Sequence, residues 1–584
     1  MVILLTGATI MAVADKPAAR VPIFSVRSFG AIPGDGLDDS AAMQRAADRV
    51  CAIPGGATLY YPRGVYNINK IVDLATIFSG NLRAYSILYK DCRRVWIRGE
   101  GARIEVKGDF EKKVTETFCY QQKNWREADK FQFTPFSFQN VNNLTISGFE
   151  IDGNVDQMTQ SDPNIFLCER NEYGIFIVSG VGIRLTDLNV HHMATDGILL
   201  GLGKEIEFER VRSTNNIRDN VSIGQARNVL VTDSDFHNAG VGGTAPNSYP
   251  FHSPGRGVNI EPECYPKGAG WAPPGAGVCS DLVGMTGNIL FDSVRVTGNL
   301  GGGIAMAHGE STANVTVRNS FLQNPLGKSG DVTTMGIVGG VVEDSTLDSQ
   351  NGFAVFCVTG GVPAQLTSSV WTGYLQDLAN DPSLIARRIH RQTDPTFSTT
   401  LQRNTITGQA TKFLCQNATP RMTVVNNKIR GVLLQTPPEP SYFRYFGHMV
   451  VFSGTPGATC STGLEWAKQL TFENNDIFIP HAAPRPAQAY GEIGYCGTKL
   501  ELTKNTYRTD TGNATHPLRV YYNRAQGVGS VAEDCFPASG AIIAVDEDGR
   551  PYPLTTQGTQ KCLTLPQPSD PSPKGVAPSE ERGS

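Results

Sequence analysis

The sequence is poor in charge and lacks long runs of any one kind. Aspartate, glutamate, lysine and arginine together make up 18% of its 584 residues, and no cluster of lysine and arginine stands out. The formal net charge of −4 therefore comes without the basic patch that nucleic-acid-binding proteins carry, so nucleic acid is not an expected partner. Apart from the first residues, no apolar run approaches the length needed to cross a bilayer, and membrane insertion is not expected.

Zinc-finger motifs are also missing, so no metal site is predicted. The twelve cysteines are an even number, which is typical of an oxidising compartment, although buried free thiols are the alternative in a chain of this length. Two pairs lie close in sequence and are the predicted disulfides, Cys264 with Cys279 and Cys535 with Cys562.

The two ends of the chain differ in composition from the rest. An apolar run, Val2–Met11, precedes a small-residue cleavage-like site at Ala12–Ala14, so residues 1–20 predict either a signal peptide without its basic region or an apolar first strand. We expect a secreted or periplasmic protein. Residues 511–565 are expected to form a C-terminal cap, and the proline- and serine-rich residues 566–584 a disordered tail.

The chain is rich in turn residues and contains a repeat. Its 62 glycines and 35 prolines are typical of turn-rich all-β structure. Similar apolar triplets recur at intervals of about 23 to 26 residues, which is one coil of a β-solenoid per step. The aligned triplets are Leu144–Ile146, Ile183–Leu185, Ile206–Phe208, Val229–Val231, Ile289–Phe291 and Val315–Val317. Recurring asparagines, as at Asn426–Asn427 and Asn474–Asn475, extend the pattern to about residue 510 and are interpreted as structural turns whose side chains stack.

The segment Ser28–Ile68 reads as turn, helix, strand, turn and strand. Its residues Asp38–Ser40 offer N-cap oxygens to a helix of about a dozen residues. The segment resembles the opening of the pectate-lyase-like, rhamnogalacturonase- and epimerase-like superfamily of right-handed parallel β-helices. That resemblance implies a single all-β solenoid over residues 21–510 with an N-terminal capping helix. Loop insertions are expected at about 109–136, 238–287, 359–399 and 432–468.

Aligning the coils predicts one surface column formed by Tyr173, Asp196, Asp219 and Arg256. Parallel strands stack about 4.8 Å apart, so the two aspartates should face each other at a separation that glycosidases use for paired carboxylates. Like charges at that distance raise one pKa and leave a protonated acid beside an ionised base or nucleophile. The alternative is structural: Asp196 as a turn residue and Arg218 with Asp219 as a surface ion pair.

The same column partly resembles the polygalacturonase-type glycoside hydrolases. The matching segments are Ala194–Gly197, Arg218–Asn220 and Gly255–Gly257. Arg218 stands where that family has the first Asp of a pair, Arg256 stands where it has His, and its Arg-Ile-Lys motif is absent. Strict strand alternation predicts that Glu261 points outward beside Asn259 and supplies the missing carboxylate.

The predicted function is the cleavage of glycosidic bonds in a polysaccharide, with hydrolysis by paired carboxylates as the first choice. Asp219 or Asp196 is the expected general acid, with the other or Glu261 as base or nucleophile. Predicted substrate-binding residues are Arg218, Asn220, Arg256, Asn259, His192 and His308. Two arginines favour a uronic-acid-containing glycan, because guanidinium binds carboxylate with two hydrogen bonds.

The alternatives are a polysaccharide lyase, a C5-epimerase and a non-catalytic glycan-binding adhesin, since β-helices host all of these. No cofactor is expected, with Ca²⁺ reserved for the lyase case.

Overall fold

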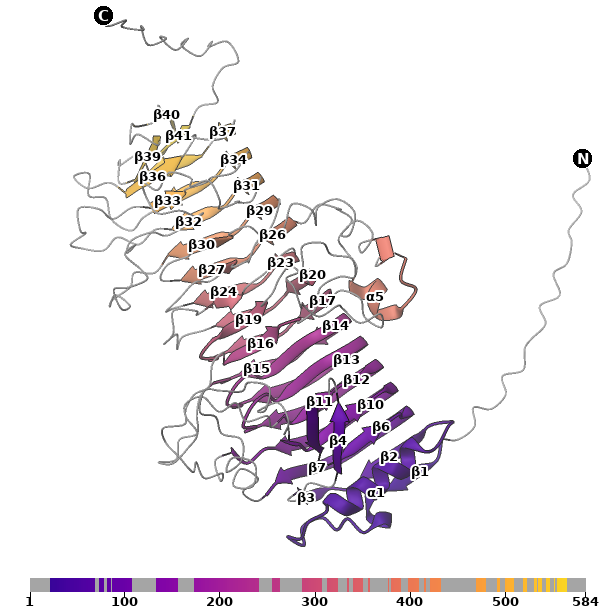
Figure 1. The fold of residues 1–584 in the computed structure, drawn as a ribbon. Coiled ribbons are helices and arrows are strands. Elements are labelled where there is room, and N and C mark those ends of the chain that lie inside the picture. The colour runs from indigo at the N-terminus through magenta and orange to yellow at the C-terminus, as the bar shows by residue number, and fades with distance from the viewer. Residues whose placement is uncertain are drawn as a thin grey trace, which may run out of the picture.

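The chain forms an elongated solenoid of parallel strands with a helix at its N-terminal end (Figure 1). The computed structural model describes residues 21–68, 73–77, 81–85, 87–107, 133–155, 173–240, 255–262, 286–306, 312–323, 333–335, 340–349, 356–357, 376–377, 380–389, 398–408, 414–415, 421–431, 469–478, 491–493, 499–508, 518–522, 530–532, 534–537, 542–546, 551 and 554–563. Residues 1–20, the predicted insertion at 432–468, His308, the pair Cys264–Cys279 and the predicted tail lie outside the described residues.

Three ladders of parallel strands run along the solenoid. The first joins β1 (Ile23–Ser25), β2 (Ala57–Tyr61), β7 (Arg93–Val106), β10 (Val141–Asp152), β12 (Gly180–His191), β13 (Ile198–Thr214), β14 (Val221–Thr232), β17 (Thr286–Asp292), β20 (Thr312–Arg318), β23 (Gly340–Glu343), β26 (Ser398–Gln402), β29 (Arg421–Val425), β31 (Gln469–Glu473), β34 (Lys499–Thr503) and β37 (Ser530–Ala532). The strands β7, β10, β12, β13 and β14 continue around a corner. β13 therefore serves all three ladders, and each of the others serves two.

The second and third ladders share those long strands. The second adds β3 (Gly64–Ile68), β15 (Asp235–His237), β18 (Arg295–Thr297), β21 (Phe321–Gln323), β24 (Thr346–Ser349), β27 (Thr405–Gly408), β30 (Lys428–Gly431), β32 (Asp476–Phe478), β35 (Thr506–Arg508) and β38 (Cys535–Pro537). The third joins β6 (Leu88–Lys90), β9 (Phe136–Gln139), β11 (Ile175–Ile177), β13, β14, β16 (Arg256–Ile260), β19 (Gly302–Met306) and β22 (Thr333–Met335). The predicted fold class, an all-β parallel β-helix, is confirmed.

Smaller sheets accompany the ladders. They are formed by β4 (Asp73–Ile77), β5 (Asn81–Tyr85) and β8 (Phe133–Thr134), by β25 (Phe356–Cys357) and β28 (Leu414–Cys415), and by β33 (Gly491–Ile493), β36 (Leu518–Tyr522) and β39 (Ile542–Asp546). Parallel pairing in the main ladders continues past residue 510 to β37 and β38, one coil beyond the predicted end. An antiparallel hairpin of β40 (Leu554–Gln557) and β41 (Gln560–Leu563) then pairs with β38.

The register of the coils follows the apolar triplets. Ile183 pairs with Ile206, Ile206 with Val229, and Val229 with Ile289, as the spacing predicts. In the triplet Ile206–Phe208 the first and last side chains are fully buried, whereas Glu207 points outward, because successive side chains of a strand alternate between faces. The apolar sides of all coils join into one continuous core.

Helix α1 (Ser40–Cys51) closes the N-terminal end of that core. Met43, Ala46 and Val50 are fully buried and pack with the first coils. The carboxylate of Asp38 accepts the N–H and the hydroxyl of Ser40 and so caps the helix. Asp39 does not cap but accepts backbone N–H groups of residues 32 and 67, tying the helix start to β3. These aspartates are therefore structural, as the sequence predicts.

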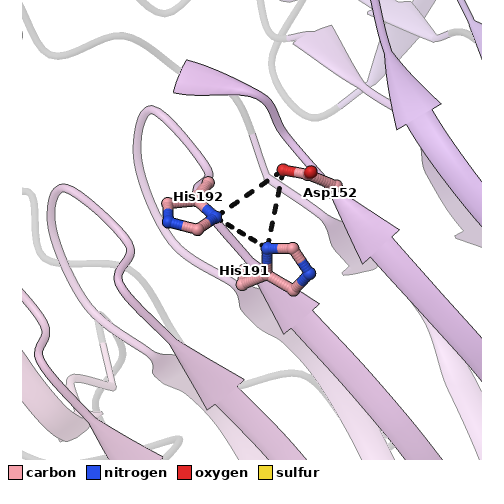
Figure 2. A group of neighbouring side chains, drawn as sticks. All are labelled: Asp152, His191 and His192. Atoms are coloured by element: carbon pink, nitrogen blue, oxygen red, sulfur yellow. Dashed lines mark hydrogen bonds and ion pairs between the residues drawn. The ribbon is translucent and has the colours of Figure 1, made fainter. Parts of the chain in front are cut away.

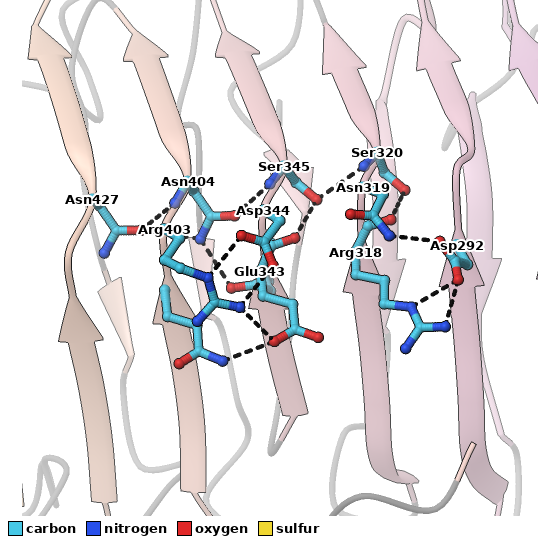
Figure 3. Close-up of polar contacts among 12 residues, drawn as sticks. Asp292, Arg318, Asn319, Ser320, Glu343, Asp344, Ser345, Arg403, Asn404 and Asn427 are labelled. Carbon is cyan, nitrogen blue, oxygen red and sulfur yellow. Dashed lines mark hydrogen bonds and ion pairs between the residues drawn. The ribbon is translucent and has the colours of Figure 1, made fainter. Parts of the chain in front are cut away.

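The stacked asparagines form a buried hydrogen-bonded ladder. Figure 3 shows its step from Asn427 to Asn404. The side-chain oxygen of Asn427 accepts the backbone and side-chain N–H groups of Asn404 at 2.9 and 3.1 Å. Asn475 does the same for Asn427, and Asn505 for Asn475. Each amide also donates to a backbone carbonyl of the preceding coil, which satisfies buried groups at every corner.

The helix α5 (Leu384–Ile389), within the predicted insertion at 359–399, lies over the first ladder and buries Ile389 against Leu230 and Leu290. The predicted disulfide between Cys535 and Cys562 is present, and Cys51 is bonded to Cys92. No helix in the described part of the chain is long and apolar enough to span a bilayer.

Candidate active site

The predicted column is formed where the chain turns into the third ladder. Ile175, Ile198, Val221 and Val258 pair in register across β11, β13, β14 and β16. The residues two positions earlier, Tyr173, Asp196, Asp219 and Arg256, therefore stack on one another as the sequence predicts. Parallel stacking turns a 23-residue spacing in the sequence into contact between neighbouring coils.

The turn before β13 requires glycine next to Asp196. A Cβ atom on Gly197 would lie 2.1 Å from the hydroxyl of Ser213 and 2.8 Å from the backbone oxygen of Asn220. Only a residue without a side chain allows the coils to approach this closely. Gly197 thereby brings the backbone that carries Asp196 against the backbone that carries Asp219, whose carbonyl accepts the Gly197 N–H at 3.0 Å.

The two aspartates face the same side of the coil and share a hydroxyl. The Ser222 hydroxyl lies 2.8 Å from Oδ2 of Asp196 and 3.5 Å from Oδ2 of Asp219. The Asp219 N–H donates to Oδ1 of Asp196 at 3.1 Å. Both side chains are almost completely buried, with 1% and 0% exposure. The pair therefore holds two carboxyl groups in a low-dielectric site.

Positive charge and hydrogen-bond donors surround this pair. The Nε atom of Arg218 lies 3.7 Å from an oxygen of each aspartate. The Arg256 N–H donates to Oδ1 of Asp219 at 2.6 Å. Burial, and after it the charge of Asp196, raises the pKa of Asp219 to about 7, whereas Arg218 acts in the opposite direction. Near neutral pH, Asp219 is therefore a carboxyl group able to give or take a proton.

Asn259 connects Glu261 to the aspartates. Its Nδ2 donates to Oε2 of Glu261 at 2.9 Å and to Oδ2 of Asp219 at 3.2 Å, and its Oδ1 accepts from Arg256 at 2.7 Å. Because one nitrogen bridges them, these two carboxylate oxygens lie at most about 6 Å apart. Glu261, unlike Asp219, is partly exposed.

Asn220 and His192, two further predicted substrate-binding residues, do not face the carboxyl pair. Asn220 is fully buried; its Nδ2 donates to the His237 carbonyl and to Asn299, and its Oδ1 accepts from Asn216. These contacts are structural and turn Asn220 away from solvent. His192 lies in a separate cluster with Asp152 and His191, in which burial lowers the pKa of His191. That cluster is where the described residues could hold a metal ion.

Strand alternation in the sequence predicts that Ser222 lies on the outward face below Asn259, but it assigns Ser222 no role in the site. Ser222 pairs in register with Asn259, so the alternation that places Asn259 and Glu261 outward also places Ser222 on the same face. The signal available in the sequence is a serine three positions after Asp219, at an outward-facing position of β14. Its partner, the Asp196 carboxylate, belongs to the preceding coil.

Comparison with known proteins gives one family and several similar folds. Residues 23–244 match the family described as rhamnogalacturonase A/epimerase, pectate lyase-like. No functionally curated protein matches the chain significantly.

Two solved structures are similar to this chain. The mannuronan C-5 epimerase AlgE6 A-module of Azotobacter vinelandii is 13% identical, with a TM-score of 0.44, over 90% of this chain and 99% of that chain. The surface adhesin PfbA of Streptococcus pneumoniae is 11% identical, with a TM-score of 0.41, over 93% of this chain and 98% of that chain. The predicted resemblance to the pectate-lyase-like β-helices is thus confirmed by the family match over residues 23–244, which include Asp196 and Asp219 but not Arg256 or Glu261.

Proposed function

We propose that this protein is a glycoside hydrolase that cleaves an acidic polysaccharide, with Asp219 as the general acid. The observation that carries the proposal is the buried carboxyl pair, in which Asp219 has a pKa of about 7 and lies beside Asp196. A carboxyl group protonated near neutral pH is what a glycosidic oxygen needs as it leaves. The carbohydrate-acting family matched by residues 23–244 supports a glycan substrate.

Glu261 is the proposed nucleophile. It is partly exposed and is bridged to Asp219 through Asn259. We assign the retaining mechanism because a single Asn259 nitrogen holds one oxygen of each carboxyl group at most about 6 Å from the other, and retaining enzymes place their carboxyl groups about 5–5.5 Å apart. In that mechanism Glu261 attacks the anomeric carbon while Asp219 protonates the departing oxygen. Water then breaks the glycosyl–enzyme ester with Asp219 acting as base.

Asp196 is assigned to tuning rather than to proton transfer. Its carboxylate accepts the Asp219 N–H and the Ser222 hydroxyl, and its negative charge helps to keep Asp219 protonated. Asp219 itself is 0% exposed. A local movement therefore has to admit the substrate, on the side where the side chains of Arg218, Arg256 and Glu261 are partly exposed.

The charges of that rim favour an acidic sugar. With Asp219 protonated, the negative charges of Asp196 and Glu261 are balanced by Arg218 and Arg256, so a substrate carboxylate meets no net repulsion. Guanidinium groups at the rim would bind it with paired hydrogen bonds. The two disulfides favour an oxidising compartment, and we propose a secreted or periplasmic location.

The test is an assay of the purified protein on acidic and neutral polysaccharides that reads reducing ends and near-ultraviolet absorbance together. Hydrolysis releases reducing ends without the absorbance of an unsaturated uronide. The Asp219→Asn variant should lose about 10²- to 10⁴-fold in rate, the usual contribution of a general acid. Asp187→Asn, which alters an exposed carboxylate paired with Arg210, should keep the wild-type rate.

Two outcomes would overturn the proposal. Growth of near-ultraviolet absorbance with the reducing ends would assign β-elimination instead. Glycan binding without release of any product, in the wild type as in Asp219→Asn, would assign a non-catalytic binding protein.

A further inference from the structure

A second constellation of chemical groups lies where β10 and β12 end, apart from the carboxyl pair. Asp152 and His191 are the last residues of these neighbouring strands and pair in register, and His192 follows directly. Figure 2 shows the three side chains turned toward one another. His192 has a φ of 55°, in the left-handed region, which folds its ring back beside that of His191, with the ring centroids 4.9 Å apart.

Three potential ligand atoms converge. Nδ1 of His191 lies 2.7 Å from Nδ1 of His192, and Oδ1 of Asp152 lies 3.5 and 3.7 Å from these two nitrogens. The three atoms are equidistant from a point about 2 Å from each, which matches the Zn²⁺ bond lengths of about 2.0–2.2 Å to imidazole and carboxylate. A hydrogen bond between the two rings would explain the nitrogen separation alone. A bound metal ion would explain all three distances.

Hydrogen bonds to neighbouring groups orient these three atoms for metal binding. Nε2 of His191 lies 3.1 Å from Oε1 of Glu150; a proton donated there leaves the lone pair of Nδ1 directed at the cluster. Oδ1 of Asp152 accepts a hydrogen bond from the Asn154 N–H at 2.9 Å, and Oδ2 accepts one from the Arg103 guanidinium. Carboxylates on a histidine's far nitrogen and donors on a ligating carboxylate are the outer partners that metal sites use to orient their ligands.

We propose that Asp152, His191 and His192 bind one divalent transition-metal ion of the zinc class, with at least one coordination position left for water or another ligand. Two imidazoles and one carboxylate suit Zn²⁺ and exclude a preference for Ca²⁺, which takes oxygen ligands. His192 is the entry side, because its side chain keeps 34% exposure while those of His191 and Asp152 keep 11% and 8%. This site goes beyond the glycan-cleaving function and does not depend on it.

The test is isothermal titration calorimetry of the full chain, freed of metal by a chelator and titrated with ZnCl₂. The wild type should bind Zn²⁺ with a dissociation constant below about 100 μM, and His192→Gly should weaken this binding at least tenfold, or about 1.4 kcal/mol. Glycine tolerates the left-handed backbone at position 192, so this variant should keep the wild-type fold. Glu150→Gln, which changes the hydrogen-bond partner of His191 but no metal ligand, should weaken binding by 10- to 100-fold.

His237→Ala is the matched control. His237 is also hydrogen-bonded to an aspartate, with Nδ1 3.0 Å from Asp235, but it belongs to no cluster of three ligands in the described part of the chain. Its substitution should leave the dissociation constant unchanged. Absence of Zn²⁺ binding in the wild type, or equal binding by wild type and His192→Gly, would overturn the proposal.

Discussion

Replacing Asp219 by asparagine should make the protein less sensitive to alkaline conditions. The folded-state pKa of Asp219 is raised from 3.8 to about 7, chiefly by burial and then by Asp196. Between these two values the native state holds a proton that the unfolded state has released. The stabilisation from Asp219 is therefore fully present below about pH 4 and is lost as the pH rises through about 7.

The size of the effect follows from the shift. At 1.36 kcal/mol per pKa unit, moving from 3.8 to about 7 corresponds to a loss of about 4 kcal/mol in the free energy of unfolding between acid and mildly alkaline pH. Asparagine keeps an acceptor for the Arg256 N–H but turns an amide toward the Nδ2 group of Asn259, which costs about 1–3 kcal/mol. That cost is independent of pH, so it cancels when two pH values are compared.

The assay is urea denaturation of wild type and Asp219→Asn at about pH 4 and about pH 8. The free energy of unfolding of Asp219→Asn, minus that of wild type, should rise by up to about 4 kcal/mol between about pH 4 and about pH 8. Asp187→Asn is the control, because hydrogen bonding to Arg210 lowers the pKa of Asp187 and its stabilisation is lost as the pH falls instead. The same relative stability of Asp219→Asn at both pH values would refute a native-state proton on Asp219.

Two further predictions concern the coil itself. Asn475→Ala should lower the free energy of unfolding by about 2–5 kcal/mol in urea denaturation, because it leaves the Val424 carbonyl and the Asn427 N–H buried without partners. Asn474→Gly, at an exposed neighbour with a left-handed φ of 53°, should change it by less than about 1 kcal/mol, and an equal loss in both would contradict the ladder's role. Removing the disulfide by the paired substitutions Cys535→Ser and Cys562→Ser should destabilise the C-terminal coil by about 3–4 kcal/mol, measured as faster amide exchange in β38 and β41. Unchanged exchange there would show that the pairing of β38 with β41 stabilises this coil without the disulfide.

The sequence predicts the coil well because neighbours in space are one repeat apart in sequence. Where the repeat is uninterrupted, as from Asp196 to Asp219, a shift of 23 residues leads directly to the residue stacked above. Arg256 is predicted correctly although an insertion precedes it, since the pattern of its strand, with Val258 and Ile260 inward, matches that of β14.

Side-chain direction at the corners is harder to predict. Strand alternation applies to Asn259, within β16, and extends to Glu261, directly after it, and it predicts that both lie on the outward face. Asn220 lies in the turn before β14, where backbone dihedral angles change from residue to residue, so alternation does not apply. Its amide turns inward to the buried asparagines Asn216 and Asn299.

The sequence by itself determines the β-helix, the register of its coils and the column through Asp196, Asp219 and Arg256, because all of these follow from the period of the apolar pattern. Only the tertiary structure decides what those groups do. The shared Ser222 hydroxyl and the burial that raises the pKa of Asp219 depend on how closely neighbouring coils pack. The pairing of Asp152 with His191 follows from the same register, because each lies eight residues after the aligned Leu144 and Ile183, but only the tertiary structure turns His192 back toward them.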